Sequence, residues 1–151
     1  MFAFKHNKGF TLIELLVVIS IIGFLATASI VAFNIIRIRA KNTRCQADLK
    51  QILTAIDSER DTHNTTLLGV TGSSCTDCSC RPFDQATLDS SACVNMLSST
   101  FRSLGFRDTM KDPWGVAYMI DENEKESGSC GYDSLRSLNC GSIFVSHYIC
   151  N

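Results

Sequence analysis

One apolar segment near the amino terminus limits what this chain can fold into. Residues 10–36 contain a single charged side chain, Glu14, among aliphatic, aromatic and small polar residues. At about 1.5 Å per residue, a helix of this length spans roughly 40 Å, which exceeds the ~30 Å hydrocarbon core of a bilayer. The segment therefore predicts a helix that crosses a membrane. Its Gly, Ala, Ser and Thr residues suit close packing of helices in lipid.

The residues before this segment predict how it is processed. A secretory signal peptide has an apolar region of only about 7–15 residues, followed by a small-residue cleavage site. Here the basic stretch with Lys5, His6 and Lys8 stops at Gly9, and the longer apolar segment that follows has no A-x-A exit. If any segment is removed, we expect it to be the leader, residues 1–9, while the helix stays with the mature protein.

The junction between leader and helix, KGFTLIEL at residues 8–15, resembles the prepilin processing signal of type IV pilins and type II secretion pseudopilins. The resemblance implies cleavage after Gly9 by a prepilin peptidase on the cytoplasmic side and N-methylation of the new amino terminus at Phe10. It also implies an α+β pilin fold. In that fold a long amino-terminal helical spine, whose first half spans the membrane, packs on a small antiparallel β-sheet head that contains disulfides.

Glu14 is the candidate assembly residue. An ionised group inside a membrane span costs roughly 3 to more than 10 kcal/mol, so it is a functional candidate by default. The amine of Phe10 on a neighbouring subunit would neutralise this carboxylate at low dielectric, and that amine exists only after cleavage. The alternative is that Glu14, close to the start of the helix, merely reaches the membrane interface.

The helix is expected to continue beyond the membrane. No Gly or Pro occurs between Gly23 and Gly69, and apolar residues recur at helical spacing. These residues are Ile38, Cys45, Leu49, Ile52 and Ile56, with Arg44, Lys50, Asp57 and Arg60 off the stripe. Residues 37–63 therefore predict an amphipathic continuation that ends near His63, and a rod of ~50 residues and roughly 80 Å.

Eight cysteines predict a disulfide framework and an oxidising compartment for the head, residues 64–151. They are Cys45, Cys75, Cys78, Cys80, Cys93, Cys130, Cys140 and Cys150. Cys75, Cys78 and Cys80 lie too close together to form a scaffold among themselves, so we expect them to reach Cys93 and the carboxy-terminal cysteines. For Cys140, both Cys130 and Cys150 are open as partners. The alternative is a metal site at the C-x-x-C step of residues 75–78, which lacks a second pair of ligands.

Charge gives conflicting indications of topology. The leader carries Lys5 and Lys8, but four basic residues follow the span, so the positive-inside count alone would place the head in the cytoplasm. The four are Arg37, Arg39, Lys41 and Arg44. The cysteines and the processing motif indicate the reverse. We therefore expect a single pass through the cytoplasmic membrane with leader inside and head outside, and later a cell-surface or periplasmic filament.

The head itself is acidic. From Cys45 onward there are eight Lys or Arg against fourteen Asp or Glu, a net charge of −6. Nucleic-acid binding usually requires a basic face. The composition therefore predicts no nucleic-acid partner.

The elements of the head are predicted from local patterns. Residues 62–76 are rich in Thr, Ser and Gly and indicate a loop. A helix capped by Asp89 or Ser90 and running through Leu104 would bury Ala92, Cys93, Met96, Leu97, Phe101 and Leu104. Residues 116–120 and 142–149 indicate strands. The stretch DPWGVAY at residues 112–118 resembles one in secretion pseudopilins and many small bacterial pilins.

Asp121, Glu122 and Glu124 are weak calcium candidates. Carboxylate oxygens are suitable calcium ligands, and major secretion pseudopilins bind calcium near the carboxy terminus. This sequence has neither that family's aspartate spacing nor its late tryptophan, and acids after a strand are typical of a solvated turn. We expect no other metal and no cofactor.

These features together predict a structural subunit of a type IV pilus-like filament, polymerised through its amino-terminal helix. Its partners would be other copies of itself, the membrane, the prepilin peptidase, and a pilus or secretion assembly platform. One alternative is a type II secretion pseudopilin. Another is a minor tip pilin that binds DNA or a surface, for which Arg81, Arg102, Arg107 and Lys111 would form the patch.

We expect no enzyme and assign no catalytic residue. The sequence suggests neither a Ser-His-Asp arrangement nor a glycine-rich phosphate loop. An anchored redox protein using Cys75, Cys78 or Cys80 is the remaining alternative.

Overall fold

The computed structural model describes residues 9–73, 75–124 and 131–146, and for Ala28 and Val31 it describes the backbone alone. The helices are α1 (Leu12–His63), α2 (Leu67–Thr71), η1 (Asp77–Cys80, a 3-10 turn), α3 (Gln85–Leu88) and α4 (Ser91–Ser103). The strands are β1 (Met119–Asp121), β2 (Ser134–Ser137) and β3 (Gly141–Phe144). A long amino-terminal helix, a small antiparallel sheet and disulfides confirm the predicted α+β pilin fold.

Helix α1 belongs to two compact units. It ends at His63, where the sequence pattern predicts its end. One unit is Met1–Ala40 and the other is Lys41–Asn151, so the second unit begins inside the helix. We refer to residues 12–40 as the apolar half and to residues 41–63 as the striped half, and describe each within its own unit.

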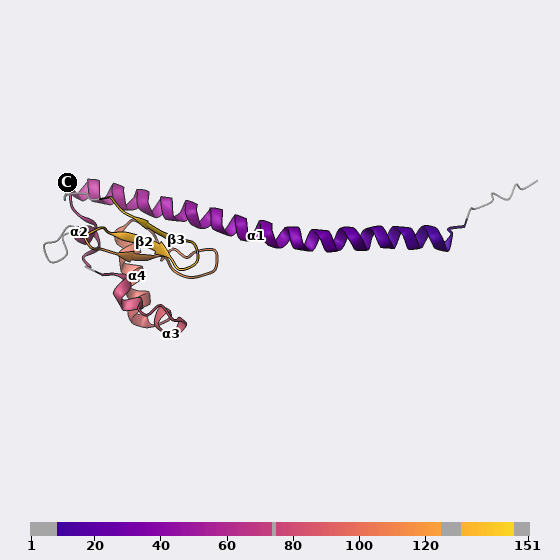
Figure 1. Ribbon diagram of the computed structural model, residues 1–151. Coiled ribbons are helices and arrows are strands. Elements are labelled where there is room, and N and C mark those ends of the chain that lie inside the picture. The colour runs from indigo at the N-terminus through magenta and orange to yellow at the C-terminus, as the bar shows by residue number, and fades with distance from the viewer. Residues whose placement is uncertain (1–8, 74, 125–130, 147–151) are drawn as a thin grey trace, which may run out of the picture. The chain divides into compact units, whose positions relative to one another are not determined.

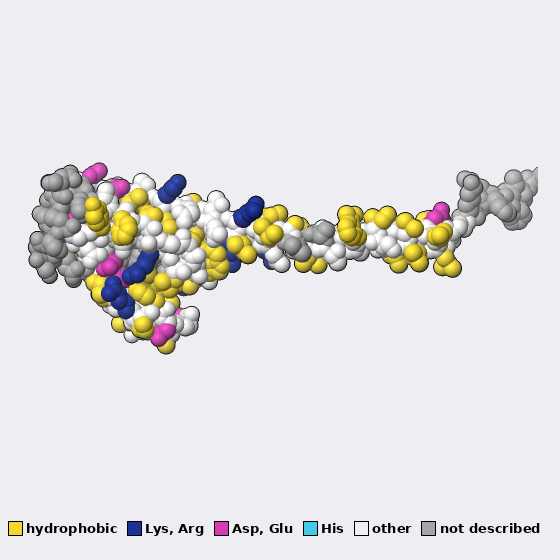
Figure 2. Space-filling view, in the orientation of Figure 1, with side chains coloured by type: hydrophobic (Ala, Val, Ile, Leu, Met, Phe, Trp, Pro, Cys, Tyr) yellow, Lys and Arg dark blue, Asp and Glu magenta, His cyan; other side chains and the backbone are white. Residues whose placement is uncertain are grey.

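The apolar half has exposed apolar side chains on all sides. Its large residues range from Val18, 46% exposed, to Leu12, 88% exposed, and Figure 2 shows hydrophobic side chains along its visible face. Among the described residues, α1 is a helix long and apolar enough to cross a membrane, with a mean hydropathy of 2.6 over its most apolar window. The hydroxyls of Ser20 and Ser29 donate to carbonyls one turn earlier, at 2.8 Å each. These polar side chains are therefore satisfied within the helix.

The striped half forms one wall of the head's core. Cys45, Leu49, Ile52 and Ile56 are fully buried or nearly so. They pack with side chains from α2, α4, the sheet and the segments around it: Leu67, Phe101, Leu104, Tyr118, Ile120, Leu135 and Val145. The predicted stripe is confirmed from Cys45 onward, whereas Ile38 lies in the apolar half and is exposed. Arg60 was expected off the stripe, but it is buried.

The sheet has the order β1-β2-β3, with both pairs antiparallel (Figure 1). Leu135 pairs with Ile120 on one side and with Ile143 on the other. Strand β2 was not predicted, because Ser-Leu-Arg-Ser offers one apolar residue and no β-branched one. Strand β1 begins later than predicted. Strand β3 begins at Gly141 and ends at Phe144, and residues 147–149 of its predicted range lie outside the described residues.

Two other local predictions need correction. Helix α4 is capped by Ser90, whose hydroxyl accepts from the Cys93 N–H at 3.2 Å, but its buried face includes Thr100, while Ala92 is exposed. The predicted loop at residues 62–76 contains α2, which Thr66 caps and which buries Leu67. A capping threonine followed by two leucines was the signal missed there.

Candidate processing and assembly site

The first turn of α1 is closed by a reciprocal pair of hydrogen bonds between Thr11 and Glu14. The Thr11 N–H and hydroxyl donate to Glu14 Oε2 at 2.9 and 2.8 Å, and the Glu14 N–H donates to Thr11 Oγ1 at 3.3 Å. This is a capping box, in which a Thr and a Glu three residues later satisfy each other's backbone donors. The carboxylate is therefore fixed at the helix start, where the helix dipole favours a negative charge.

The peptide bond between Gly9 and Phe10 lies outside the helix. Both residues are exposed and neither is in regular structure, and the Phe10 side chain is 81% exposed. A peptidase needs such accessible, non-helical backbone. Phe10, Ile13, Glu14 and Val17 also line one shallow hollow. The predicted processing and assembly residues are thus adjacent in the unit Met1–Ala40.

The disulfides differ from the predicted pairs in two of three cases. Cys80 bonds to Cys93, as the sequence analysis expected. Cys45 bonds to Cys140, and Cys75 bonds to Cys78. The prediction that Cys140 pairs with Cys130 or Cys150 is wrong, because packing places the turn before β3 against the striped half. Cys130 and Cys150 themselves lie outside the described residues.

The prediction that Cys75 and Cys78 bond elsewhere is also wrong. The turn at η1 brings their Cα atoms to 5.3 Å, within the range a disulfide needs. Cys75, Asp77 and Cys78 also lie close enough together to share a metal ion. In this structure the two sulfurs are bonded to each other, so they are not thiolate ligands.

The three calcium candidates have separate protein partners. Asp121 contacts Arg81 at 3.4 Å. Glu122 is fully buried and accepts from the N–H and hydroxyl of Thr76 at 2.7 and 2.5 Å. Glu124 is 1% exposed and contacts Arg60 at 3.1 Å. Each of these three carboxylates therefore has its own partner among the described residues.

Arg60 joins the end of α1 to two later segments. Its Nη2 donates to Glu124 Oε2, and both its terminal nitrogens donate to the Ser146 carbonyl at 3.0 Å. Arg60 and Glu124 are each 1% exposed. Buried charges need such a partner and such hydrogen bonds, because removing one partner would leave an uncompensated charge.

Asp112 organises the Asp-Pro-Trp-Gly turn. Its Oδ1 accepts from the N–H groups of Trp114 and Val116 at 3.0 Å, and its Oδ2 accepts from the Ser137 hydroxyl and the Asn139 amide at 2.8 Å. Burial alone would raise the pKa of Asp112, but these four hydrogen bonds outweigh it and lower the pKa. The turn is thereby joined to the β2–β3 connection that carries Cys140.

Burial has the opposite result at two other carboxyls. It raises the pKa of Glu122 despite the hydrogen bonds from Thr76, and raises the pKa of Asp133 despite those from the Glu124 and Asn123 N–H groups. Burial, with a smaller contribution from the hydrogen bond to Asp48, also raises the pKa of Tyr118. Sequence reasoning missed these buried polar groups because nothing in the local pattern separates them from surface acids.

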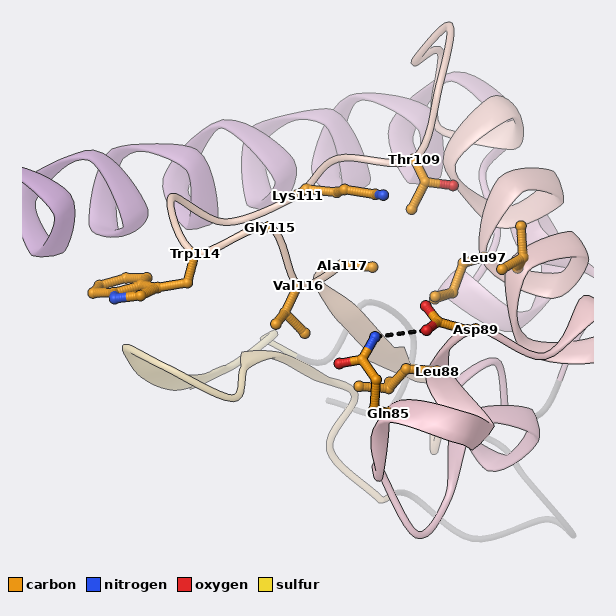
Figure 3. A pocket seen from close by; sticks show the side chains of 11 residues that line it. Gln85, Leu88, Asp89, Leu97, Thr109, Lys111, Trp114, Gly115, Val116 and Ala117 are labelled. Atoms are coloured by element: carbon orange, nitrogen blue, oxygen red, sulfur yellow. Dashed lines mark hydrogen bonds between the residues drawn. The ribbon is translucent and has the colours of Figure 1, made fainter.

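A pocket of about 290 Å³ lies beside the Asp-Pro-Trp-Gly turn. Its lining includes Leu88, Leu97, Lys111, Val116 and Ala117. Gln85 donates to Asp89 at 2.7 Å, and Figure 3 shows the Trp114 ring pointing away from the other lining side chains. The pocket could hold a small ligand, but its mixed charges favour no ligand class.

The predicted basic patch is only partly available. Arg81 contacts Asp77 and Asp121, so two carboxylates oppose its charge. Lys111 lies at the pocket instead. Arg102 and Arg107 are exposed.

Three comparisons bear on what these features mean. The prokaryotic N-terminal methylation motif matches residues 4–30. The chain is 41% identical over 62 residues to the type IV major pilin protein PilA of Myxococcus xanthus, covering 39% of this chain and 28% of that protein. It is also 41% identical over 54 residues to two fimbrial proteins of Pseudomonas aeruginosa, covering 36% of this chain and 35% of each. The chain thus spans about a third of the length of these curated relatives, and no solved structure matches it significantly.

Proposed function

We propose that this chain is a member of the type IV pilin family and a structural subunit of a surface pilus, which its amino-terminal similarities support. In this proposal a peptidase removes residues 1–9 and the new amino terminus at Phe10 is methylated. The subunit waits in the cytoplasmic membrane with its head outside, and copies then assemble through the apolar half of α1.

The observation that carries the proposal is the exposure of that apolar half beside a fixed carboxylate. An apolar surface on every side of a helix needs lipid or other protein to cover it. Within its unit the window of highest hydropathy has no buried residue, so the described residues of that unit do not cover it. Lipid would cover this surface after membrane insertion, and identical helices would cover it after assembly.

Glu14 gives the assembly its register in this proposal. Thr11 fixes the carboxylate at the start of the helix. A neighbour's Phe10 amine approaching this position would meet a preformed acceptor in a low-dielectric setting, where the charge pair is strong. The relatives are pilins and fimbrial proteins, which supports a structural role rather than an enzymatic one.

A type II secretion pseudopilin is the second candidate. The Asp-Pro-Trp-Gly turn, organised by Asp112, is compatible with it, because the corresponding sequence resembles secretion pseudopilins as well as many small bacterial pilins. The three disulfides among the described residues favour the pilus, since an exposed surface filament benefits from covalent crosslinks. Filaments sheared from whole cells would contain the protein if it is a pilin. A pseudopilin would be absent there, and its deletion would block protein secretion.

The proposal is tested by changing Glu14 in two ways. Glu14→Gln retains an acceptor for Thr11 but removes the charge, whereas Glu14→Ala removes both. We expect both variants to be membrane-inserted and processed to a methylated Phe10 start, as measured by intact mass and amino-terminal sequencing. We also expect both to be depleted from sheared filaments.

Gly9→Ala serves as the processing control and should leave the chain starting at Met1. Filaments of Glu14→Gln at wild-type yield would contradict charge pairing. A wild-type membrane protein that still starts at Met1 would overturn the proposed function as a whole.

A further inference from the structure

The disulfides among the described cysteines differ in how far solvent can reach them. Cys45, Cys80 and Cys93 are fully buried, Cys75 and Cys140 are half-buried, and Cys78 alone among the described cysteines is exposed. Thiol–disulfide exchange requires a thiolate to approach one of the bonded sulfurs. Among the described disulfides, Cys75–Cys78 is therefore the most accessible to an external thiol, because it contains the exposed cysteine and neither of its cysteines is fully buried.

The two residues between these cysteines are fixed by contacts that do not involve sulfur. Thr76 is fully buried, bonds to Glu122 through its N–H and hydroxyl, and shares a hydrogen bond of 2.9 Å with the Thr100 hydroxyl. Asp77 is also fully buried and forms ion pairs with Arg81, at 3.0 Å, and with Arg136 on β2. These partners come from α4, from β2 and from the residues that directly follow β1 and η1.

Because of these contacts, the Cys75–Cys78 bond is not needed to hold the local backbone in place. The backbone between the cysteines stays anchored when the sulfur–sulfur bond opens. Cys45–Cys140 differs because it joins the striped half to the turn before β3, 95 residues away in sequence. Cys80–Cys93 joins η1 to α4.

We propose that Cys75–Cys78 is a reversible thiol–disulfide exchange site on the head, with a dithiol protein as its partner, while Cys45–Cys140 and Cys80–Cys93 are structural. This inference is independent of whether the chain polymerises. Cys78, the exposed cysteine of the pair, is the point of attack. Arg81 and Arg136 lie near it, each ion-paired with Asp77.

The exchange balances in two steps. A thiolate of the partner attacks Cys78 Sγ, a new sulfur–sulfur bond forms, and the Cys75–Cys78 bond breaks. The Cys75 sulfur leaves with the electron pair and takes a proton from water. The second thiolate of the partner then attacks the partner's sulfur in the mixed disulfide. The partner's own disulfide forms, and the Cys78 sulfur is released as a thiolate that takes a proton from water. The head disulfide is reduced to two thiols as the partner's dithiol is oxidised to a disulfide.

The geometry also allows the bond to form again. The Cys78 N–H donates to the Cys75 carbonyl at 3.3 Å, and this contact together with the Thr76 and Asp77 anchors keeps the two residues together. Cys75 Sγ lies 3.4 Å from Asp77 Oδ1, so the reduced thiol has an acceptor there. Both thiols remain available for reoxidation by a partner disulfide.

Selective reduction tests the proposal. The full-length chain in detergent is treated with dithiothreitol at neutral pH, quenched with iodoacetamide at successive times and mapped by peptide mass spectrometry. We expect Cys75 and Cys78 to be alkylated at least about tenfold faster than Cys80 and Cys93, because only the first pair is accessible. Equal rates, or a Cys75 or Cys78 bonded to Cys130 or Cys150 in untreated protein, would overturn it.

Paired variants separate an exchange site from a structural crosslink. We expect the double variant Cys75→Ser/Cys78→Ser to unfold cooperatively with a Tm lowered by less than about 4 °C. The matched variant Cys80→Ser/Cys93→Ser should lower the Tm at least about twofold more, because it loses a larger closed loop. A loss of cooperative unfolding in the first variant would contradict the proposal even if labelling were selective.

Discussion

The two halves of α1 belong to one continuous helix, yet their apolar side chains have different surroundings. In the apolar half, residues such as Ile19 and Phe24 are 60% and 74% exposed within their unit. In the striped half, Cys45, Ile52 and Ile56 are fully buried by the head. The difference follows from periodicity. A one-sided stripe can be covered by a small sheet, whereas an apolar surface on all sides needs lipid or several other helices.

The largest expected effect comes from removing the covalent link of the striped half. The double variant Cys45→Ser/Cys140→Ser should lower the free energy of unfolding by about 4–5 kcal/mol, because a loop of this length restricts the unfolded chain most. Denaturant unfolding of the full chain in detergent, followed by fluorescence of Trp114, the single tryptophan, measures it. Cys80→Ser/Cys93→Ser is the control, with about 3 kcal/mol expected. A smaller loss in the first variant would contradict this account.

Matched truncations in the two halves should separate stability from assembly. Ile52→Ala should lower the free energy of unfolding by about 2–5 kcal/mol, because it leaves a cavity in the core. Ile19→Ala should change unfolding of the head by less than about 0.5 kcal/mol, since its side chain is exposed there. The same two variants are compared for recovery in sheared filaments, where Ile19→Ala should be depleted despite a stable head. Equal unfolding midpoints would show that the striped half is not part of the core.

The stability of the unit that contains the striped half should depend on pH, because this unit has buried carboxyls. Burial raises the pKa of Glu122 above its unfolded value, so the folded state holds the proton more strongly. The stability from this proton is complete below the ordinary Glu pKa of about 4.3 and is lost as pH rises through the raised pKa. We expect wild type to gain stability relative to Glu122→Gln as pH falls from 7 toward 5. Parallel urea-midpoint curves would contradict the assignment.

The smallest effect is expected at the boundary between the halves. The Lys41 ammonium lies 5.2 Å from the centre of the Trp114 ring. An exposed cation–π contact of this kind contributes about 0.5–1 kcal/mol, so Lys41→Met should lower stability by that amount and change Trp114 fluorescence. Lys50→Met, on the exposed side of α1, is the control. If both variants unfold alike, Lys41 does not fix the turn to the helix.

Much of the fold could be predicted from local sequence patterns. The apolar segment, the absence of Gly and Pro between Gly23 and Gly69, and the stripe through Ile56 indicate the helix that the structure places at Leu12–His63. Ser90 was one of two predicted caps for α4. These predictions hold because helix propensity and periodicity act over neighbouring residues.

Contacts between distant residues were predicted poorly. Cys130 and Cys150 were both left open as partners of Cys140, but the packing of the sheet on α1 brings it to Cys45. Glu122 and Glu124 read as solvated acids, whereas both are buried. Burial of a charge depends on which distant side chain can pair with it, and one sequence does not show that.

By itself, the sequence determined the helix, its division into an apolar and a striped half, and the motif at Gly9, Phe10 and Glu14. Each of these depends on residues within a few turns of one another. Only the tertiary structure decided the pairing of Cys45 with Cys140, the burial of Arg60 with Glu124, and the anchoring of Thr76 and Asp77 between two bonded cysteines. These depend on loop closure and on the packing of a sheet whose middle strand has no strong sequence signal.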